Sequence, residues 1–600
     1  MGKSSFFNTL KTNSPLESMA QRRRASASFP SREISVAMDK RMKRIMDMRI
    51  FKLERRISDA LSRASSRAYG VILLTFGLLS LILYFVGLYP DRSLTNPIVA
   101  LSCVLLSVLF LSSDRSIPII LQSYAPTDFI FFEFFCMKRM NKAEKNVNLP
   151  AALTIIVGVL LAVCGCFVPL WMVVSAVLCA ILVFLFFVSP EFAFFISLMI
   201  LPYSGYIPYS EVIFPCVVAL AVLSFCRKVL YGKRVISFER YDLLLGLMLL
   251  CILVSGIFVK GIESFSMSVG MVIMAMGYML AGNMITNRRL ADRVINTLVF
   301  SSTVLAVISL IQLAVIIWRH DTSEQIIGHL DGVLARTDGV AVYLLAAFVF
   351  SIFFVKHSSG AGRVTHITAL IVNLAALIVS GEMFALLAIL LSVVAYSVLK
   401  ANNHVWLTLP LLLSLPYVTF IVVSRYFEEL FNLVPSLYTV DHLLSVWEKC
   451  IFALFANPLA GIGMGTDSFV TEMAKYGIVG LPDSSNLFIE IGLEAGVLAL
   501  IFFLLILTTR IGHRRKYYNY VRSSQVSGAT LVSEVCFFAL VAFGCMNYIW
   551  SDISAYYLFW VVFGIGSATM RVAKRENDDL VFYYQDTMAV DSSAIDVRVG

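Results

Sequence analysis

The sequence predicts an all-α fold, that of a polytopic integral membrane protein with about 16 transmembrane helices, in the range 14–16. Hydrophobic residues make up 59% of the 600 residues and charged residues only 14%, whereas a soluble domain is roughly 45–50% apolar and about 25% charged. Apolar runs long enough to cross a membrane recur along the chain, and basic residues gather between alternate runs. This composition excludes a soluble enzyme, a nucleic-acid-binding protein and an intrinsically disordered protein.

The net charge of +9 comes from the N-terminal tail, residues 1–67. This tail has 16 Lys and Arg against 6 Asp and Glu, and the rest of the chain has 32 against 33. Within residues 34–67, apolar side chains recur at helical spacing between basic ones. We therefore expect a basic cytoplasmic tail with an amphipathic helix that binds the anionic inner leaflet. A solvated tail that only fixes the topology is the alternative.

A helix that crosses the membrane needs about 20 mostly apolar residues. Sixteen runs qualify, of which 190–203 is the shortest. The sixteen predicted spans are 68–89, 96–112, 150–168, 170–188, 190–203, 208–226, 242–259, 266–285, 294–318, 339–355, 365–380, 383–399, 405–424, 487–509, 532–550 and 555–572.

The basic residues support this number of spans through the positive-inside rule. With the N-terminus inside, every strongly basic loop falls on the cytoplasmic side, and so does the C-terminal tail, residues 573–600. Omitting the span 190–203 would place all later basic loops outside. The basic loops are 113–149, 227–241, 286–293, 356–364 and 510–531.

Two of the predicted external connections are long, residues 319–338 and residues 425–486. The second has three Lys and Arg against seven Asp and Glu, and it precedes the last three spans. Any chemistry outside the membrane has to use these two segments and the span ends beside them. The chain has no Walker loop and no HExxH motif, and we expect no metal and no cofactor.

The loop 425–486 and the span after it contain a signature. Trp447 precedes the segment Pro458-Leu459-Ala460-Gly461-Ile462-Gly463, and Ser485-Asn486 is followed after nine residues by Gly496. This resembles the bacterial O-antigen ligase and O-antigen polymerase family, in which a Trp, a Pro-Leu-x-Gly-x-Gly turn and His-Asn precede a Gly-x-x-Gly at the start of a span. Ser485 stands at the position of the family's His, and Ala499 at that of its last Gly.

Two weaker segments extend the resemblance to roughly residues 150–572, the ligase-like membrane domain. The segment Arg336–Gly339 is similar to the family's Arg-x-x-Gly. The segment Ser380–Ala388 is similar to its Thr-Gly-Ser-Arg-Gly-Ala-Leu-Leu-Ala, with Met383 in place of the Arg. Residues 68–149, with two spans and a cytoplasmic loop, are additional.

The resemblance implies a metal-independent membrane glycosyltransferase whose donor is a polyprenyl-diphosphate-linked oligosaccharide. It implies a polymerase or a ligase of cell-surface polysaccharide biosynthesis, in the cytoplasmic (inner) membrane of a bacterium, with other polysaccharide assembly proteins as partners. Two alternatives stay open. One is an exporter or flippase of polysaccharides or lipid-linked oligosaccharides, and the other is a family member with altered or absent catalysis.

Transfer from such a donor releases a diphosphate anion, and arginine pairs with phosphate oxygens through its planar fork. By the resemblance Arg336 matches a family arginine, and Arg425 and Arg319 are further cations at predicted external span ends. Each is alternatively an interfacial cation that reaches toward the headgroups. The residues predicted to contact the substrate are Trp447, Ser485, Asn486 and Arg319.

A base must take the proton of the acceptor hydroxyl, and the resemblance assigns this role to the His that Ser485 replaces. The predicted substitutes are His442 and Glu494. His442 is alternatively an ordinary surface residue, and Glu494 a structural carboxylate that pairs with an arginine. Further candidates are Glu490, His320 and His329.

The same loop contains a predicted amphipathic helix over residues 440–456, ended by Pro458 and Gly461. Its apolar face is expected to pack against the ends of the spans. This face consists of Leu443, Leu444, Trp447, Ile451, Leu454 and Phe455.

The topology can be tested by cysteine accessibility in a variant without the native cysteines. The loop 425–486 should face outside, because all strongly basic loops then lie in the cytoplasm with both termini. A membrane-impermeant thiol reagent added to intact cells should label Val470→Cys and should not label Tyr520→Cys. The reverse labelling pattern would contradict the topology and the function inferred from it.

Overall fold

The structure is a computed structural model whose described residues form helices and no β-strand. Eleven of these described helices are long and apolar enough to cross a membrane, which confirms an all-α, polytopic membrane protein. The structure describes residues 49–89, 93–135, 149–231, 236–259, 262–319, 337–380, 382–401, 414–418, 440–523 and 526–596, together with positions 137, 139 and 234.

The predicted number of 16 spans is not confirmed. Three predicted spans are apolar helices of less than spanning length: α6 (Thr95–Leu111), α9 (Ala151–Cys164) and the segment Phe384–Lys400 of α19 (Met383–Ala401). Most of the predicted span 405–424 lies outside the described residues.

The predicted span 190–203 is a short helix followed by a tighter turn. α11 (Pro190–Ile200) has 11 residues and gives way to the 3-10 helix η2 (Leu201–Tyr206). At 1.5 Å per residue α11 reaches about 16 Å, roughly half of the hydrocarbon core. Most of α11 is buried, including Phe194 and Leu198, so it packs within the protein and does not cross a membrane alone.

The chain forms two compact units, and the first contains the N-terminal helices. Here α5 (Ser66–Val86) packs against both α6 and α9. Phe76, Ala100 and Ala162 form the core between them, and the hydroxyl of Tyr89 donates to the carbonyl of Ala162 at 3.2 Å. Among the described residues, the other helices that lie wholly in this unit are α4 (Arg49–Arg63) and α7 (Ile117–Ser123).

α4 lies within the predicted amphipathic segment 34–67. Its side chains Ile57 and Leu61 are exposed although they are apolar, so the helix has an uncovered hydrophobic face between its arginines. Residues 1–48 lie outside the described residues. Binding to the anionic inner leaflet stays a prediction that the exposed face favours.

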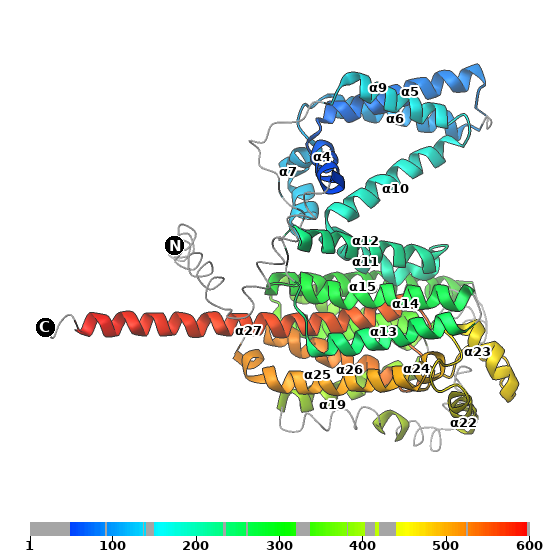
Figure 1. Ribbon diagram of the computed structural model, residues 1–600. Helices are drawn as coiled ribbons and strands as arrows, with labels where there is room; N and C mark the ends of the chain where they lie inside the picture. Colours follow the sequence, from blue (N-terminus) through cyan, green and yellow to red (C-terminus); the bar gives the residue numbers. More distant parts are fainter. Residues whose placement is uncertain are drawn as a thin grey trace. The chain divides into compact units, whose positions relative to one another are not determined.

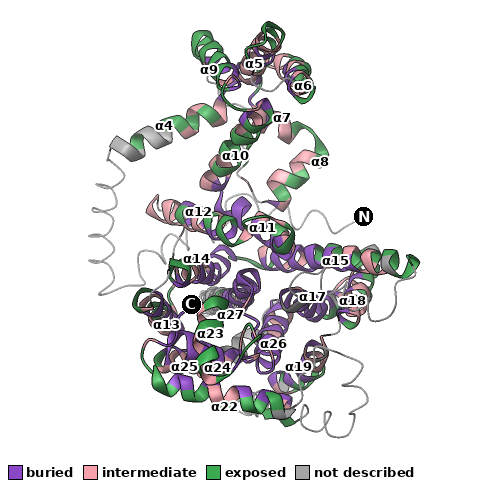
Figure 2. Cartoon of the chain, turned by 90° about the vertical axis from the view of Figure 1, so that its right-hand side faces the viewer, coloured by how far each residue is buried: buried purple, intermediate pink, exposed green. Residues whose placement is uncertain are grey.

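The second unit is organised around α27 (Ile553–Asp596) and α26 (Ser527–Gly544), drawn at its centre in Figures 1 and 2. The apolar length of α27 is entirely buried, so protein and not lipid surrounds this part of the helix. α27 packs against α14 (Ile262–Met284), α17 (Thr337–His357), α25 (Val497–Ser523) and α26. α10 (Leu170–Val188) and α12 (Ser210–Leu230) have residues in both units.

The remaining elements of the second unit are α8 (Ala125–Thr127), the π-helix η1 (Asp128–Phe134), α13 (Arg240–Phe258), α15 (Arg288–Trp318), α18 (Ala361–Val379), α22 (Val440–Ala456), α23 (Thr466–Met473), the 3-10 helix η4 (Ala474–Tyr476) and α24 (Leu487–Ala495).

Two helices extend beyond the predicted membrane boundary. α25 continues to Ser523, through much of the predicted cytoplasmic loop 510–531, and α27 continues to Asp596, through most of the predicted tail 573–600. Arg510, predicted to lie in that loop, is in fact fully buried inside the bundle. A charge counted as a loop cation is therefore a structural part of the core.

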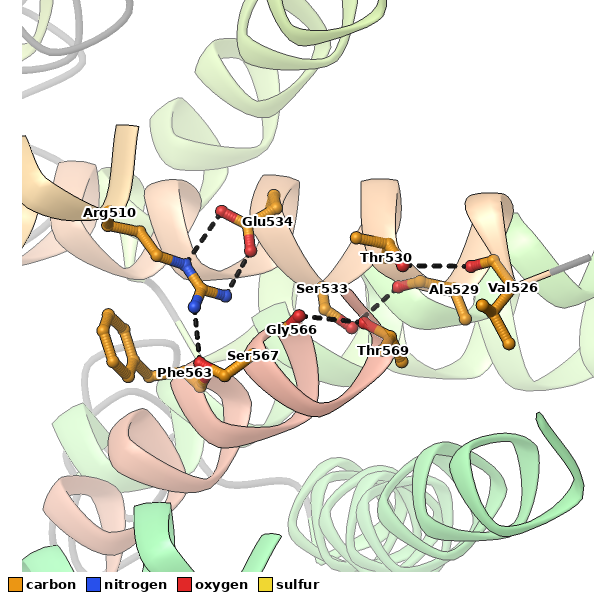
Figure 3. Close-up of polar contacts among 10 residues, drawn as sticks. All are labelled: Arg510, Val526, Ala529, Thr530, Ser533, Glu534, Phe563, Gly566, Ser567 and Thr569. Carbon is orange, nitrogen blue, oxygen red and sulfur yellow. Dashed lines mark hydrogen bonds and ion pairs between the residues drawn. The ribbon is translucent and has the colours of Figure 1, made fainter. Parts of the chain in front are cut away.

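Arg510 forms a buried ion pair with Glu534 that joins three helices (Figure 3). The Nε of Arg510 on α25 donates to Glu534 on α26 at 3.2 Å, Nη2 donates to its other oxygen, and Nη1 donates to the hydroxyl of Ser567 on α27. The guanidinium carbon lies 4.5 Å from the centre of the Phe563 ring. The ion pair between Arg510 and Glu534 neutralises both charges inside an apolar bundle, where a single unpaired charge would be strongly destabilising.

Removal of one partner should therefore be far more damaging than removal of both. Glu534→Ala should lower the free energy of unfolding by about 3–5 kcal/mol, because it leaves Arg510 charged and unpaired. The double variant Arg510→Met, Glu534→Leu should recover most of this loss. Asp114→Ala is the control, because Asp114 pairs with Arg67 at 2.8 Å with both side chains more than half exposed, and it should cost only about 0–1 kcal/mol.

Thermal unfolding in detergent measures this series. A double variant as unstable as Glu534→Ala would contradict the role of the pair.

Candidate functional site

The glycine-rich turn of the signature, residues 457–465, lies against the break between α24 and α25. The N–H of Ile462 donates to the carbonyl of Leu493 at 2.8 Å, and the N–H of Val497 donates to the carbonyl of Pro458 at 2.8 Å. These bonds satisfy backbone groups that a helix end leaves without a partner. The predicted span 487–509 consequently begins at Val497 in the structure, after the separate short helix α24.

Glycine is required on both sides of this contact. Gly461 has φ +69° and Gly496 has φ +87°, in the left-handed region that side chains rarely adopt. A Cβ on Gly461 would lie 2.4 Å from the carbonyl oxygen of Glu494, and a Cβ on Gly496 would lie 2.4 Å from that of Leu459. The presence of glycine at both positions of the signature thus has a steric cause.

Asn486 fixes the start of α24. Its Oδ1 accepts from the N–H groups of Phe488 and Ile489 at 3.0 and 3.2 Å, as an N-cap does. Its Nδ2 donates to the hydroxyl of Tyr417 and to the carbonyl of Cys545, at 2.8 and 2.9 Å. The side-chain amide is buried and makes four bonds inside the protein, so a contact with substrate would need one of them to break.

Ser485 and Trp447 flank this cap. Ser485 is half-buried at φ 53°, and its N–H donates to Asp483 at 2.8 Å. The indole N–H of Trp447 donates to the carbonyl of Ser484 at 2.9 Å, and its ring meets Tyr417 edge-on at 5.6 Å. Trp447 therefore holds the segment before α24 against α22.

Glu490 and Glu494 are fully buried on α24. Glu494 accepts from the N–H of Gly465 at 2.9 Å and from the hydroxyl of Tyr548. Glu490 accepts from the N–H of Ser484 at 2.8 Å, and its Oε1 has no partner among the described residues. The described partners of Glu494 are a backbone group and a phenol, whereas the structural alternative expected an arginine.

Burial raises the pKa of both carboxyl groups. Loss of hydration raises the pKa of Glu494 from its ordinary value of 4.5 to about 7, although the bonds from Tyr548 and Gly465 oppose the rise. Loss of hydration, followed by the nearby charge of Glu494, raises the pKa of Glu490 well above 4.5. A carboxyl group that titrates near neutral pH can exchange a proton under physiological conditions.

The predicted helix 440–456 is confirmed as α22, Val440–Ala456, but its buried face differs from the prediction. Leu443 and Leu454 are buried as expected, whereas Leu444, Ile451 and Phe455 are exposed. The buried positions are Leu443, Val446, Cys450, Ala453 and Leu454, which pack with Phe469, Met473 and Leu493 or next to Met546.

The remaining predicted site residues are dispersed or lie outside the described residues. His442 is exposed on α22, and Arg319 is exposed directly after α15. Met383 begins α19. Arg336, Arg425, His320 and His329 lie outside the described residues. The structure thus brings together Trp447, Ser485, Asn486, Glu490 and Glu494.

Several partners of the signature were not found from the sequence. Ser255 on α13 donates to the carbonyl of Glu494, and Ser264 on α14 accepts from the N–H of Met464 at 2.9 Å. Tyr548, which bonds Glu494, lies between α26 and α27. Serines near the ends of apolar runs are the one sequence feature that marks Ser255 and Ser264, and no motif marks Tyr548.

A cavity of about 190 Å³ lies beside the connection that carries Tyr548. Its wall includes residues of η2 (Ser204 and Tyr206), the first turns of α17 (Gly339 and Tyr343) and Asp552, which precedes α27. Both the cavity and the signature loop therefore adjoin the segment 545–553. Among the described residues, no group of three or more His, Cys, Asp or Glu side chains is placed to hold a metal ion.

Comparison with known proteins finds no protein-family model and no curated protein that matches this chain.

The raised pKa of Glu494 predicts a specific pH dependence of stability. A carboxyl group whose pKa is higher in the folded than in the unfolded state binds more protons when folded, so the free energy of unfolding falls as the pH rises from about 4.5 to about 7. Glu494→Gln should flatten this fall, because the amide can pair with Gly465 and Tyr548 without ionising.

Thermal unfolding in detergent between pH 5 and pH 8 measures the slope. Glu448→Gln is the matched control, because Glu448 is exposed on α22, and it should keep the wild-type slope. An unchanged slope in Glu494→Gln would show that Glu494 is not the titrating group.

Proposed function

We propose that this chain is a membrane glycosyltransferase that moves a glycan from a polyprenyl diphosphate to an acceptor hydroxyl at the predicted external face, as a polymerase or a ligase. The observation that carries the proposal is that the signature residues form one structural contact. Gly461 and Gly496 permit the close contact of the turn with the helix break, and Asn486 caps the helix between them. Residues chosen by resemblance alone would have no reason to share one compact contact.

The location of polar groups also favours transfer over export. An exporter needs a hydrophilic passage along the length of its helices. The cavity next to Asp552 lies at the ends of α17 and α27, and the apolar length of α27 is buried in protein. A polar site at one end of the bundle fits a reaction at the membrane surface.

In the proposed reaction, the acceptor hydroxyl attacks the anomeric carbon, and the polyprenyl diphosphate leaves as an anion. Fixed cations stabilise the charge that develops on the leaving group, and they do so best in a site with little water. Arg336 is the proposed cation, with Arg425 and Arg319 as further candidates. Arg336 stands three residues before Gly339, which lines the cavity.

Substitution of Arg336 tests the proposal. Arg336→Ala should lower the rate of polymer formation about 10²–10³-fold, the effect of losing one contact worth about 2.7–4 kcal/mol in the transition state. Arg336→Lys should recover only part of the rate, because a point charge does not reproduce the bidentate fork. Ser485→Ala is the control and should be mild, since serine is not a base at neutral pH.

Polysaccharide chain length is measured in cells that lack the native gene and express each variant at the same level. Full activity of both Arg336→Ala and Arg425→Ala would contradict the transferase and favour the exporter.

A further inference from the structure

Asp552 is held in the wall of the cavity by a defined network. The residue is 8% exposed, its Oδ1 accepts from the N–H of Ser554 at 2.9 Å, and its Oδ2 accepts from the hydroxyl of Ser554 at 2.7 Å. Because that hydroxyl has one proton and gives it to Asp552, it must accept the proton of Ser204 across their 3.0 Å contact. The orientation of the carboxylate is therefore fixed from two elements, η2 and α27.

Tyr343 supplies a second polar group, which differs from Asp552 in its hydrogen bonding. It lines the same cavity from α17 and is 1% exposed, yet its hydroxyl has no hydrogen-bond partner among the described residues. A buried hydroxyl without a partner is unfavourable, because it has lost its hydrogen bonds to water. A bound ligand with a polar atom would give this hydroxyl a hydrogen-bond partner and so remove the destabilisation.

Gly339 explains why the carboxylate can lie where it does. A Cβ at this position would lie 2.3 Å from Oδ2 of Asp552, so every other residue would displace the carboxylate. Gly339 is also the glycine of the Arg-x-x-Gly segment. The glycine of that segment thus makes room for Asp552, which the resemblance does not include.

We propose that this cavity binds the acceptor sugar of the transferase and that Asp552 is the base that takes the proton from its attacking hydroxyl. The inference rests on the proposed function and names a group that substitutes for the His missing at Ser485. Carboxylate, phenol and hydroxyl groups that converge in one cavity are the groups that bind sugar hydroxyls. Tyr206 and Glu211, which also line the cavity, are exposed, so the acceptor can enter from the surface.

The step balances in atoms and charge. The acceptor oxygen forms a bond to the anomeric carbon, the bond from that carbon to the diphosphate oxygen breaks, and the electron pair leaves with the polyprenyl diphosphate. The hydroxyl proton passes to Asp552, which becomes neutral and later returns the proton to water. The hydroxyl of Tyr343 donates a hydrogen bond to the acceptor sugar, which gives that hydroxyl a partner.

A purely structural role for Asp552 gives a different expectation. Its bond to the N–H of Ser554 is that of a helix N-cap, since α27 begins at Ile553. Asparagine caps a helix as well as aspartate does but is not a base. Asp552→Asn therefore separates the two roles, because it keeps the cap and removes the proton acceptor.

The experiment uses the purified full chain in liposomes with the lipid-linked oligosaccharide fraction of the host membrane as donor and acceptor. Asp552→Asn should keep the wild-type unfolding temperature and lower kcat about 10²–10⁴-fold, the usual contribution of a general base. Tyr343→Phe should raise the KM for the acceptor roughly 2–13-fold, the effect of one lost hydrogen bond of about 0.5–1.5 kcal/mol, without loss of stability.

Tyr556→Phe is the matched control. The hydroxyl of Tyr556 is also buried without a partner among the described residues, but Tyr556 does not line this cavity, so its KM should equal that of the wild type. Wild-type kcat in Asp552→Asn, or equal KM values for Tyr343→Phe and Tyr556→Phe, would overturn the inference while the transferase stands. Absence of transfer by the wild type would overturn the proposed function together with it.

Discussion

The interruption of the helix at Gly496, between α24 and α25, is the constraint on which the predicted external end of the second unit depends. A helix that stops at Ala495 and restarts at Val497 leaves backbone groups without partners, and in an apolar setting each of them needs one. The turn at residues 457–465 supplies those partners. Gly461 and Gly496 follow from this need, because a side chain at either position would prevent the close contact.

Charged groups of the second unit are satisfied by different means inside the bundle and at the signature. Arg510 and Glu534 neutralise each other within the bundle, and this pair fixes the mutual position of α25, α26 and α27. Glu490 and Glu494 have no such cation among their described partners, and burial instead raises their pKa. The ion pair is therefore an electrostatic anchor inside the bundle, whereas Glu494 is a carboxyl group that can change its charge near neutral pH.

The sequence predicts what local pattern determines and misses what distant contacts determine. Helix 440–456 was predicted to the residue, because apolar spacing and Pro458 define its extent. The prediction of its buried face was wrong in part. Apolar residues lie on both sides of α22, and the side with the small residues Cys450 and Ala453 is the one that packs closely. Tyr548 is 54 positions from Glu494, and no local pattern could reveal their bond.

The segment 545–553 connects the signature loop to the cavity. Asn486 donates to the carbonyl of Cys545, Tyr548 donates to Glu494, and Asp552 follows four residues later in the cavity wall. A displacement of α24 would move this short segment through its two hydrogen bonds, at Cys545 and Tyr548. The Asp552 carboxylate would then shift against Gly339, which it already approaches closely. The signature residues can therefore act on the cavity without lining it, by holding one carboxylate in place.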